Sequence, residues 1–256
     1  MRALVLSAGF GQRLRPLTET TPKPLLEVGG RPLIHYPLLM LKHAGIREVA
    51  INTHHLAHAM ESALGTGAKL GIDIVWAPEP TLAGTGGPLN GLRGFLGTDT
   101  FVIANSDTIL DFDLGDAIRT HRDRSALITL AVAPAPKADY YSRIELDNTA
   151  RIRRMRLLTT LSPPTYEDFA REPLNESDLE SLMYCGVIIL EPQVLDLIPP
   201  APPWSIMNGL IGPMVRDGLP VFGAIHRGLM RTIDDLQTYE KVRTEFESNP
   251  PPLRFL

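Results

Sequence analysis

The chain has 256 residues, a size that fits one large domain, and its hydrophobic fraction of 44% and charged fraction of 21% are typical of a globular protein. Its formal net charge of -4 provides no basic field for nucleic acid or an anionic membrane, and no apolar run reaches membrane-spanning length. Cys185 is the only cysteine, which excludes an internal disulfide and agrees with a reducing cytoplasm. We therefore expect a cytoplasmic protein with neither nucleic acid nor a membrane among its partners.

The first half of the chain alternates short apolar runs with helical patterns. Strands are expected at 3–6, 48–52, 72–76, 100–104 and 127–132, and helices at 33–44, 58–64, 89–96 and 114–121. The first helix stops at Gly45, a residue well suited to a helix C-cap. Strands that alternate with helices imply βαβ units with right-handed connections. The predicted fold class is α/β, with a Rossmann-like open, mostly parallel mixed sheet and helices on both faces.

The second half has a less regular pattern. Residues 143–146 and 152–155 are expected to form a hairpin. Residues 162–181 are polar and carry three prolines, which indicates a surface excursion that is either mobile or a lid. A strand at 184–190 and a final helix at 236–246 follow, before a proline-rich tail that cannot be helical.

A glycine-containing loop, S-A-G-F-G-Q-R-L-R-P-L-T-E-T-T-P-K-P-L, follows the first strand. Gly9 and Gly11 let the backbone approach a ligand closely, and the N–H groups of such a loop form an anion-binding concavity. Arg13, Arg15 and Lys23 add three cations. Because loops at the carboxyl ends of parallel strands bind ligands in open α/β sheets, we predict a phosphate cradle.

Two other glycine-loop motifs do not fit. A dinucleotide fingerprint needs a third glycine where Leu14 stands, which argues against a dehydrogenase, and the G-K-S or G-K-T of a Walker loop is absent. For the G-x-G alone, a plain turn with solvated arginines remains the alternative interpretation, but the full string is far more specific.

That string, G-F-G-Q-R-L-R-P-L-T-E-T-T-P-K-P-L-L-E-V-G-G-R-P-L-I over residues 9–34, resembles the signature of the nucleoside-diphosphate-sugar pyrophosphorylases, G-x-G-x-R-L-x-P-L-T followed by P-K-P-L and G-x-P-L-I. Within these sugar-1-phosphate nucleotidyltransferases it is similar to the mannose-1-phosphate guanylyltransferases. The resemblance implies the nucleotide-diphospho-sugar transferase fold. It also implies that Lys23 neutralises charge around the reacting phosphates, and that the nucleotide is bound by Leu6, Ala8, Gly9, Gly11 and Arg13.

On this basis we expect one nucleotidyltransferase domain at 1–247 and a tail at 248–256. The nucleotide-binding half would be 1–132 and the sugar-binding half 133–247.

A second glycine-rich segment, L-A-G-T-G-G-P-L, precedes the helix expected at 89–96. Free N–H groups at a helix N-terminus suit anionic or carbonyl partners, although a simple loop is the alternative. The resemblance implies nucleoside contacts from Gly84, Thr85, Gly86 and Gly87. Glu79, just upstream, is a candidate acceptor for the paired N–H donors of guanine, which favours GTP slightly.

Asp107 lies just past an apolar strand in F-V-I-A-N-S-D-T-I-L. Mg²⁺ favours one or two carboxylates together with substrate phosphates, whereas a turn aspartate is the alternative for this triplet alone. In the resembled family the aspartate of N-G-D or N-S-D binds the metal, which implies the same role for Asp107. Asp111 and Asp113 are expected to cap the next helix.

The C-terminal string L-M-R-T-I-D-D-L-Q-T-Y departs from the W-x-D-I-G-T of many relatives, because direct alignment puts Thr232 at the metal-binding aspartate. Another branch has an acid two residues later, where Asp234 stands. Asp234 is therefore the predicted second metal ligand, and Asp235 is expected to begin the final helix.

The sugar pocket is weakly marked. In M-Y-C-G-V-I-I-L-E-P the resemblance implies a sugar contact from Gly186, and Arg143 is the second candidate. Cys185 has no histidine in a recognisable partner motif, so we interpret it as a strand cysteine rather than a nucleophile. His54, His55 and His58 lack a carboxylate that would complete a zinc pattern.

The resulting hypothesis is a nucleotidyltransferase that converts NTP and sugar-1-phosphate to NDP-sugar and pyrophosphate, with Mg²⁺ as cofactor and Arg13, Lys23 and Asp107 as catalytic residues. The sugar phosphate would attack the α-phosphorus in line, without a covalent protein nucleophile. The alternative is a catalytically degenerate protein that binds a nucleotide or nucleotide-sugar, and it is motivated by Thr232. A homodimer is the default expectation for a small metabolic enzyme.

Overall fold

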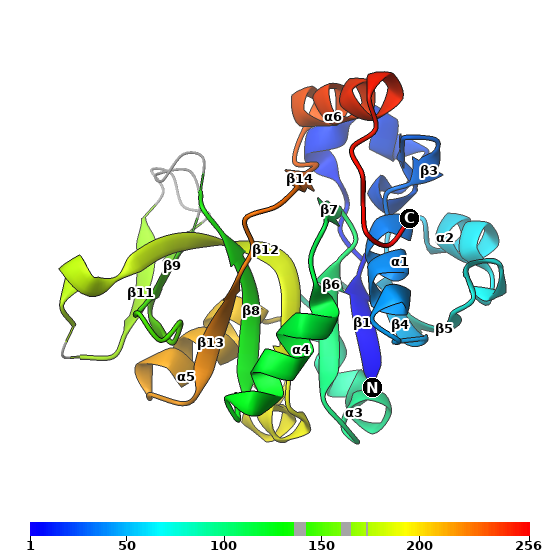
Figure 1. Cartoon of the computed structure of the whole chain (residues 1–256). Coiled ribbons are helices and arrows are strands. Elements are labelled where there is room, and N and C mark those ends of the chain that lie inside the picture. The colour runs from blue at the N-terminus through cyan, green and yellow to red at the C-terminus, as the bar shows by residue number, and fades with distance from the viewer. Residues whose placement is uncertain (136–141, 160–164, 173) are drawn as a thin grey trace. The chain divides into compact units, whose positions relative to one another are not determined.

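The computed structural model describes residues 1–135, 142–159, 165–172 and 174–256 (Figure 1). The chain folds into two compact units, each assembled from separate stretches of the sequence. The first unit comprises Met1–Leu82, Val102–Leu114 and Gly228–Leu256, and the second comprises Ala83–Phe101 and Gly115–Arg227. Among the described residues, none of the helices combines the length and apolar composition that a bilayer crossing requires.

The first unit is built on a sheet with the strand order β6-β1-β4-β5. Its strands are β1 (Arg2–Leu6), β4 (Glu48–Thr53), β5 (Asp73–Pro78) and β6 (Phe101–Asn105). β1 pairs with β4 in parallel, and β4 pairs with β5 in parallel. The centres of β1, β4 and β6 are fully buried, which explains why these strands are continuous apolar runs in the sequence.

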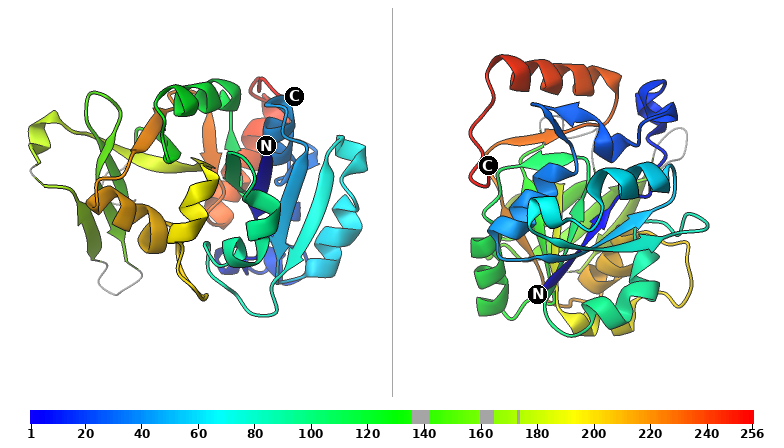
Figure 2. Two further views of the ribbon diagram at one scale, coloured as in Figure 1. Left: turned by 90° about the horizontal axis from the view of Figure 1, so that it is seen from below. Right: turned by 90° about the vertical axis from the view of Figure 1, so that its right-hand side faces the viewer.

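Helices and two small ribbons complete the first unit. They are α1 (His35–His43), α2 (Ala57–Leu64), α6 (Leu236–Ser248), the ribbon of β2 (Glu27–Val28) with β3 (Arg31–Pro32), and the ribbon of β7 (Thr108–Leu110) with β14 (Met230–Thr232). α1 ends as predicted, because Gly45 adopts a positive φ of 83° that favours glycine. α6 lies against β2 (Figure 2). Tyr239 Oη on α6 donates to the Glu27 carbonyl over 3.0 Å.

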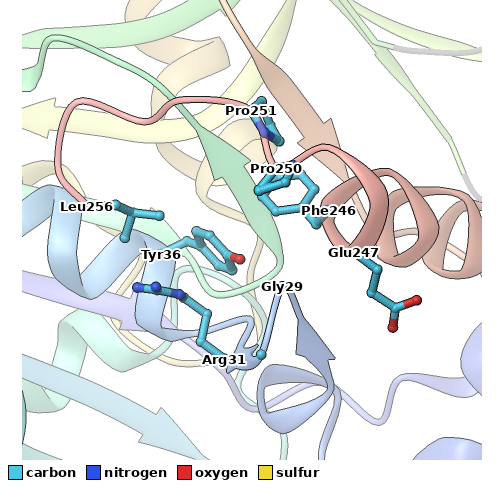
Figure 3. Close-up of a pocket in the computed structure, with 9 residues that line it drawn as sticks. Gly29, Arg31, Tyr36, Phe246, Glu247, Pro250, Pro251 and Leu256 are labelled. Atoms are coloured by element: carbon cyan, nitrogen blue, oxygen red, sulfur yellow. The ribbon is translucent and has the colours of Figure 1, made fainter.

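The C-terminal tail folds back onto the first unit. Arg254 binds Asp111 Oδ1 through its backbone N–H at 2.8 Å and Asp113 Oδ2 through Nη1 at 2.9 Å, partners that the predicted capping role did not include. A pocket of about 400 Å³ lies between the Gly29–Gly30 turn, α6 and this tail, with Tyr36 and Phe246 in its wall (Figure 3).

The second unit contains a mixed sheet. β8 (Ile128–Ala133) pairs in parallel with β13 (Val221–Ile225) and antiparallel with β12 (Glu180–Leu190). β12 also pairs with β9 (Arg143–Leu146), which forms the predicted hairpin with β10 (Ile152–Leu158). The helices of this unit are α3 (Pro88–Leu96), α4 (Leu114–Asp123) and α5 (Gly212–Arg216), the last preceded by a π-helical turn at Met207–Ile211.

The expected surface excursion at 162–181 is wrong in part. The structure forms β11 (Tyr166–Ala170) antiparallel to β10, and β12 begins at Glu180. β11 is an edge strand whose only buried residue is Phe169, so its sequence is polar. Ion pairs of Arg154 with Asp168 and Glu176 replace the apolar contacts that would have marked a strand. Pro163, Pro164 and Pro173 lie outside the described residues.

Candidate active site

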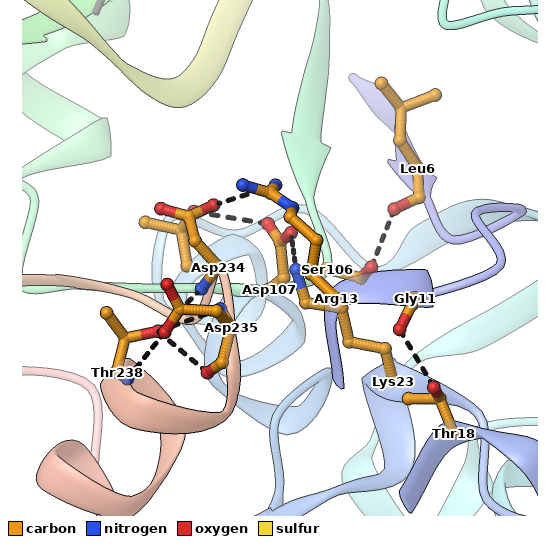
Figure 4. Close-up of polar contacts among 11 residues, drawn as sticks. Leu6, Gly11, Arg13, Thr18, Lys23, Ser106, Asp107, Asp234, Asp235 and Thr238 are labelled. Atoms are coloured by element: carbon orange, nitrogen blue, oxygen red, sulfur yellow. Dashed lines mark hydrogen bonds and ion pairs between the residues drawn. The ribbon is translucent and has the colours of Figure 1, made fainter. Parts of the chain in front are cut away.

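The predicted phosphate cradle begins where β1 ends at Leu6, and short 3-10 turns follow it. Gly11 has a φ of 60°, and its carbonyl accepts a 2.8 Å hydrogen bond from Thr18 Oγ1 (Figure 4). A Cβ at Gly11 would lie 2.9 Å from the Thr18 methyl carbon, so both the backbone and its neighbour require glycine. At Gly9 no atom lies within 4 Å of such a Cβ, which leaves room beside the loop.

Lys23 and Asp107 form an ion pair in the same unit. Lys23 Nζ lies 2.5 Å from Asp107 Oδ2, and the two side chains are 14% and 31% exposed. Asp107 follows β6, and its neighbour Ser106 donates from Oγ to the Leu6 carbonyl at 2.7 Å. The end of β6 is thereby attached to the end of β1, which brings the predicted metal ligand to the cradle.

The β7–β14 ribbon brings Asp234 close to Asp107 and the cradle. Just beyond the ribbon, the Ile233 N–H donates to the Asp107 carbonyl at 3.2 Å. The next residue, Asp234, has its Oδ1 3.5 Å from Arg13 Nη2 (Figure 4). Two cations of the cradle and two carboxylates from two other segments therefore form one cluster, which we call the charged cluster: Arg13, Lys23, Asp107 and Asp234.

Asp235 has a different task from its neighbour, as predicted. It is the N-cap of α6, where its side chain accepts from the Thr238 N–H at 2.8 Å and Thr238 Oγ1 accepts from the Asp235 N–H at 2.9 Å. The hydrogen bond from the Thr238 backbone is the main reason why the pKa of Asp235 is lowered. This capping box fixes the start of α6 and engages the Asp235 carboxylate there, while the neighbouring Asp234 carboxylate pairs with Arg13.

Glu79 is joined to the start of the cradle through Asn52. The buried Asn52 accepts from the Ser7 N–H through Oδ1 at 2.8 Å and donates from Nδ2 to Glu79 Oε1 at 2.7 Å. Because Ser7 N–H can only donate, the orientation of the Asn52 amide is determined. The candidate base acceptor is thus positioned by a hydrogen-bond chain from the cradle itself.

Phe10, between the two cradle glycines, packs against two histidines. Its ring lies 5.4 Å from that of His54 and 5.5 Å from that of His55. His54 Nδ1 also contacts the Glu79 carbonyl at 2.7 Å, so these histidines have structural partners. In the part of the chain that the structure describes, no group of three His, Cys, Asp or Glu residues could hold a metal ion. Sequence reasoning had not singled out Phe10, which is 37% exposed.

The Gly84–Gly87 loop lies in the second unit and contacts a residue that sequence reasoning missed. Gly86 N–H donates to the Trp204 carbonyl at 3.0 Å, and Thr85 Oγ1 accepts from the Ile206 N–H at 2.9 Å. Gly84 has a φ of 76°, and Gly87 is the N-cap of α3. No local pattern marks Trp204, since its partners are more than a hundred residues away in the sequence.

The two predicted sugar contacts also lie in the second unit. Gly186 has a φ of 86° and sits in β12 where the pairing register with β8 shifts, a bulge that explains the glycine. Arg143 begins β9, opposite Arg156 on β10. Burial raises the pKa of Cys185 to about 12, so its thiol stays protonated and is not a nucleophile.

A parallel sheet with a glycine loop at the end of its first strand, beside a cluster of cations and carboxylates, is typical of α/β proteins that bind phosphate groups. The chain belongs to the nucleotidyl transferase family, whose model matches residues 2–156. This confirms the family predicted from residues 9–34.

Known relatives agree with this assignment. The chain is 29% identical over 235 residues to a UTP--glucose-1-phosphate uridylyltransferase of Synechocystis sp., covering 87% of this chain and 57% of the relative. It is 30% identical over 216 residues to the mannose-1-phosphate guanylyltransferase of Mycobacterium tuberculosis, covering 84% and 56%. The chain therefore spans about half the length of these curated relatives.

The fold class is confirmed by a solved structure. A protein of Bacillus anthracis described as a glucose-1-phosphate thymidylyltransferase superimposes with a TM-score of 0.75 at 18% identity, covering 100% of this chain and 98% of that one.

Proposed function

We propose that the protein is a sugar-1-phosphate nucleotidyltransferase, which converts NTP and sugar-1-phosphate to NDP-sugar and pyrophosphate in nucleotide-sugar biosynthesis. The observation that carries this proposal is the charged cluster beside a loop with space at Gly9, within a domain of the nucleotidyl transferase family. Cations and carboxylates that converge on a phosphate loop suit charge neutralisation during transfer between phosphates.

The donor set of the charged cluster fits Mg²⁺. Asp107 and Asp234 would hold the ion, because a carboxylate pair completed by substrate phosphates is the set that Mg²⁺ prefers. When bound, the ion would neutralise phosphate charge and polarise the phosphoryl oxygens.

The remaining steps belong to the protein's own groups. Arg13, which is largely exposed, would bind the leaving pyrophosphate, and Lys23 would screen the two reacting phosphates from each other. The sugar phosphate oxygen would attack the α-phosphorus in line as pyrophosphate leaves. No covalent protein nucleophile is needed.

The base and the sugar are inferred from separate features. We infer GTP, because the Glu79 carboxylate can accept both N–H donors of a guanine edge and one curated relative is a guanylyltransferase by name. The backbone around Leu6, Ala8 and Gly9 and the loop residues Gly84, Thr85 and Gly86 would complete the nucleotide site. Gly186 and Arg143 would face the sugar. The nucleotide half would be 1–132 and the sugar half 133–247, in a cytoplasmic homodimer.

The test is pyrophosphate release across a matrix of nucleoside triphosphates and sugar-1-phosphates with Mg²⁺. Asp107→Asn should lower kcat by about 100-fold or more, since it removes a charge that positions the metal and Lys23. Asp116→Asn is the matched control, because Asp116 lies at the surface and pairs there with Arg119, at 2.9 Å. Near-normal turnover of Asp107→Asn would contradict the role of the charged cluster. Tight NTP binding by the wild type with no product in the whole matrix would instead favour the degenerate binding protein.

A further inference from the structure

Trp204 holds the Gly84–Gly87 loop by both its main chain and its side chain. Its N–H donates to the Ala83 carbonyl at 3.1 Å, and its carbonyl accepts from the Gly86 N–H at 3.0 Å. Its indole Nε1 donates to Asn90 Oδ1 at 2.9 Å, which ties the ring to the first turn of α3. All of these groups belong to the second unit, and Trp204 is only 9% exposed.

Trp204 closely approaches two glycines of the loop, Gly84 and Gly86. A Cβ at Gly86 would come under 3.0 Å from the Trp204 ring, and one at Gly84 would come under 3.0 Å from its carbonyl oxygen. The resemblance implies nucleoside contacts at these glycines. The structure assigns the close approach at Gly86 to the Trp204 ring.

The contacts with Trp204 also determine which backbone N–H groups of the loop remain available to a ligand. The Gly86 N–H is occupied by Trp204. The residues Gly84 and Thr85 are exposed, and within the described chain their amide N–H groups donate no hydrogen bond. Exposed, unpaired amides next to the N-terminus of α3 are suited to carbonyl or anionic groups.

We propose that Trp204 is a positioning residue, which fixes the loop in the conformation that leaves the Gly84 and Thr85 amides available to bind a nucleotide. This inference rests on the proposed function, because it takes the nucleoside as the ligand of the loop. Trp204 itself need not touch substrate. Loss of its ring should therefore weaken binding of the NTP and leave the apparent affinity for the sugar phosphate unchanged.

The experiment compares Trp204→Ala, Trp204→Phe and Trp76→Phe. Trp76 is the only other tryptophan, and its indole N–H donates to the Gly65 carbonyl at 3.0 Å, so Trp76→Phe loses a comparable hydrogen bond in the first unit. Titration calorimetry measures the Kd of GTP and of UTP with Mg²⁺ in the absence of sugar phosphate. Steady-state kinetics then give KM for the sugar phosphate in each variant.

We expect Trp204→Ala to raise the NTP Kd about tenfold or more, Trp204→Phe to restore most of the affinity, and Trp76→Phe to stay within about twofold. KM for the sugar phosphate should change by less than about twofold in all three. If Trp204→Ala does not fold, Trp204→Phe decides, with an expected Kd rise of about threefold over Trp76→Phe. An unchanged NTP Kd in the folded Trp204 variants, or equal losses for both substrates, overturns the inference while the proposed function stands. Absence of NTP binding by the wild type overturns both.

Discussion

A methyl group at Gly86 should destabilise the second unit because it meets the Trp204 ring. The backbone at Gly86 has no positive φ, so alanine adds no backbone strain there. Its Cβ would nevertheless lie under 3.0 Å from ring carbons. The ring cannot retreat freely, because it is 9% exposed and its Nε1 is bonded to Asn90. Overpacking of this kind costs about 1–3 kcal/mol, which is the penalty we expect for Gly86→Ala.

A double-mutant cycle separates this clash from other causes. Trp204→Ala alone should cost about 3–5 kcal/mol, because a large buried ring is lost. In that background the methyl group at position 86 no longer meets a ring, and its penalty should fall to within about 0.5 kcal/mol. Gly91→Ala is the matched control inside α3, where nothing lies within 4 Å of the added carbon, and it should be neutral or stabilising by about 0.5–1 kcal/mol.

Urea denaturation at 25 °C, followed by circular dichroism, gives the four free energies of unfolding of the cycle. The expected result is a coupling energy of about 1–3 kcal/mol between the two positions. Additive penalties would refute the explanation of Gly86 by Trp204, as would a neutral Gly86→Ala in the wild-type background.

Two further predictions concern the buried histidine of α4 and the paired aspartates before α6. Burial is the main reason that the pKa of His121 in the folded protein is lowered from 6.5. The unfolded chain therefore binds a proton at this residue more readily than the folded protein does. The free energy of unfolding should accordingly fall as the pH drops below 6.5. Replacing His121 by Gln should flatten this slope between pH 7.5 and 5 in urea titrations, whereas the exposed His58→Gln should not. Asp234→Ala should lower Mg²⁺-dependent turnover about tenfold or more with little change in Tm, and Asp235→Ala should lower Tm with turnover retained. The reverse assignment in these assays would contradict the division of roles.

Local sequence patterns predicted most strands and helices of the first unit, because the residues that specify each of these elements are close together in the sequence. Buried parallel strands such as β1 are apolar on both faces, and each helix has its own stop signal. The missed elements lack such signals. β7 and β14 have three residues each, too few for a period to emerge, and the edge strand β11 is polar.

The members of the charged cluster could be predicted, but the contacts of the second glycine loop could not. Arg13, Lys23 and Asp107 each lie in a string that matches a motif of the resembled family. Trp204 and Gly86 are linked only through the fold, since a glycine needs the same absence of a side chain whether a ligand or a tryptophan approaches it. A glycine-rich loop therefore indicates close approach without indicating what approaches.

The geometry of the β7–β14 ribbon supports the proposal that Asp234 supplies the carboxylate that is absent at Thr232. Thr232 pairs with Thr108, and the Ile233 N–H continues the hydrogen bonding to Asp107. Side chains alternate along an extended chain, so residues 232 and 234 share a face while Ile233, which is fully buried, points to the other. A carboxylate moved by two residues thus stays on the side of the ribbon that carries the charged cluster, whereas a shift of one residue would send it into the core. Asp235, one residue further along, caps α6 instead, and the departure at Thr232 is compatible with a complete pair of carboxylates.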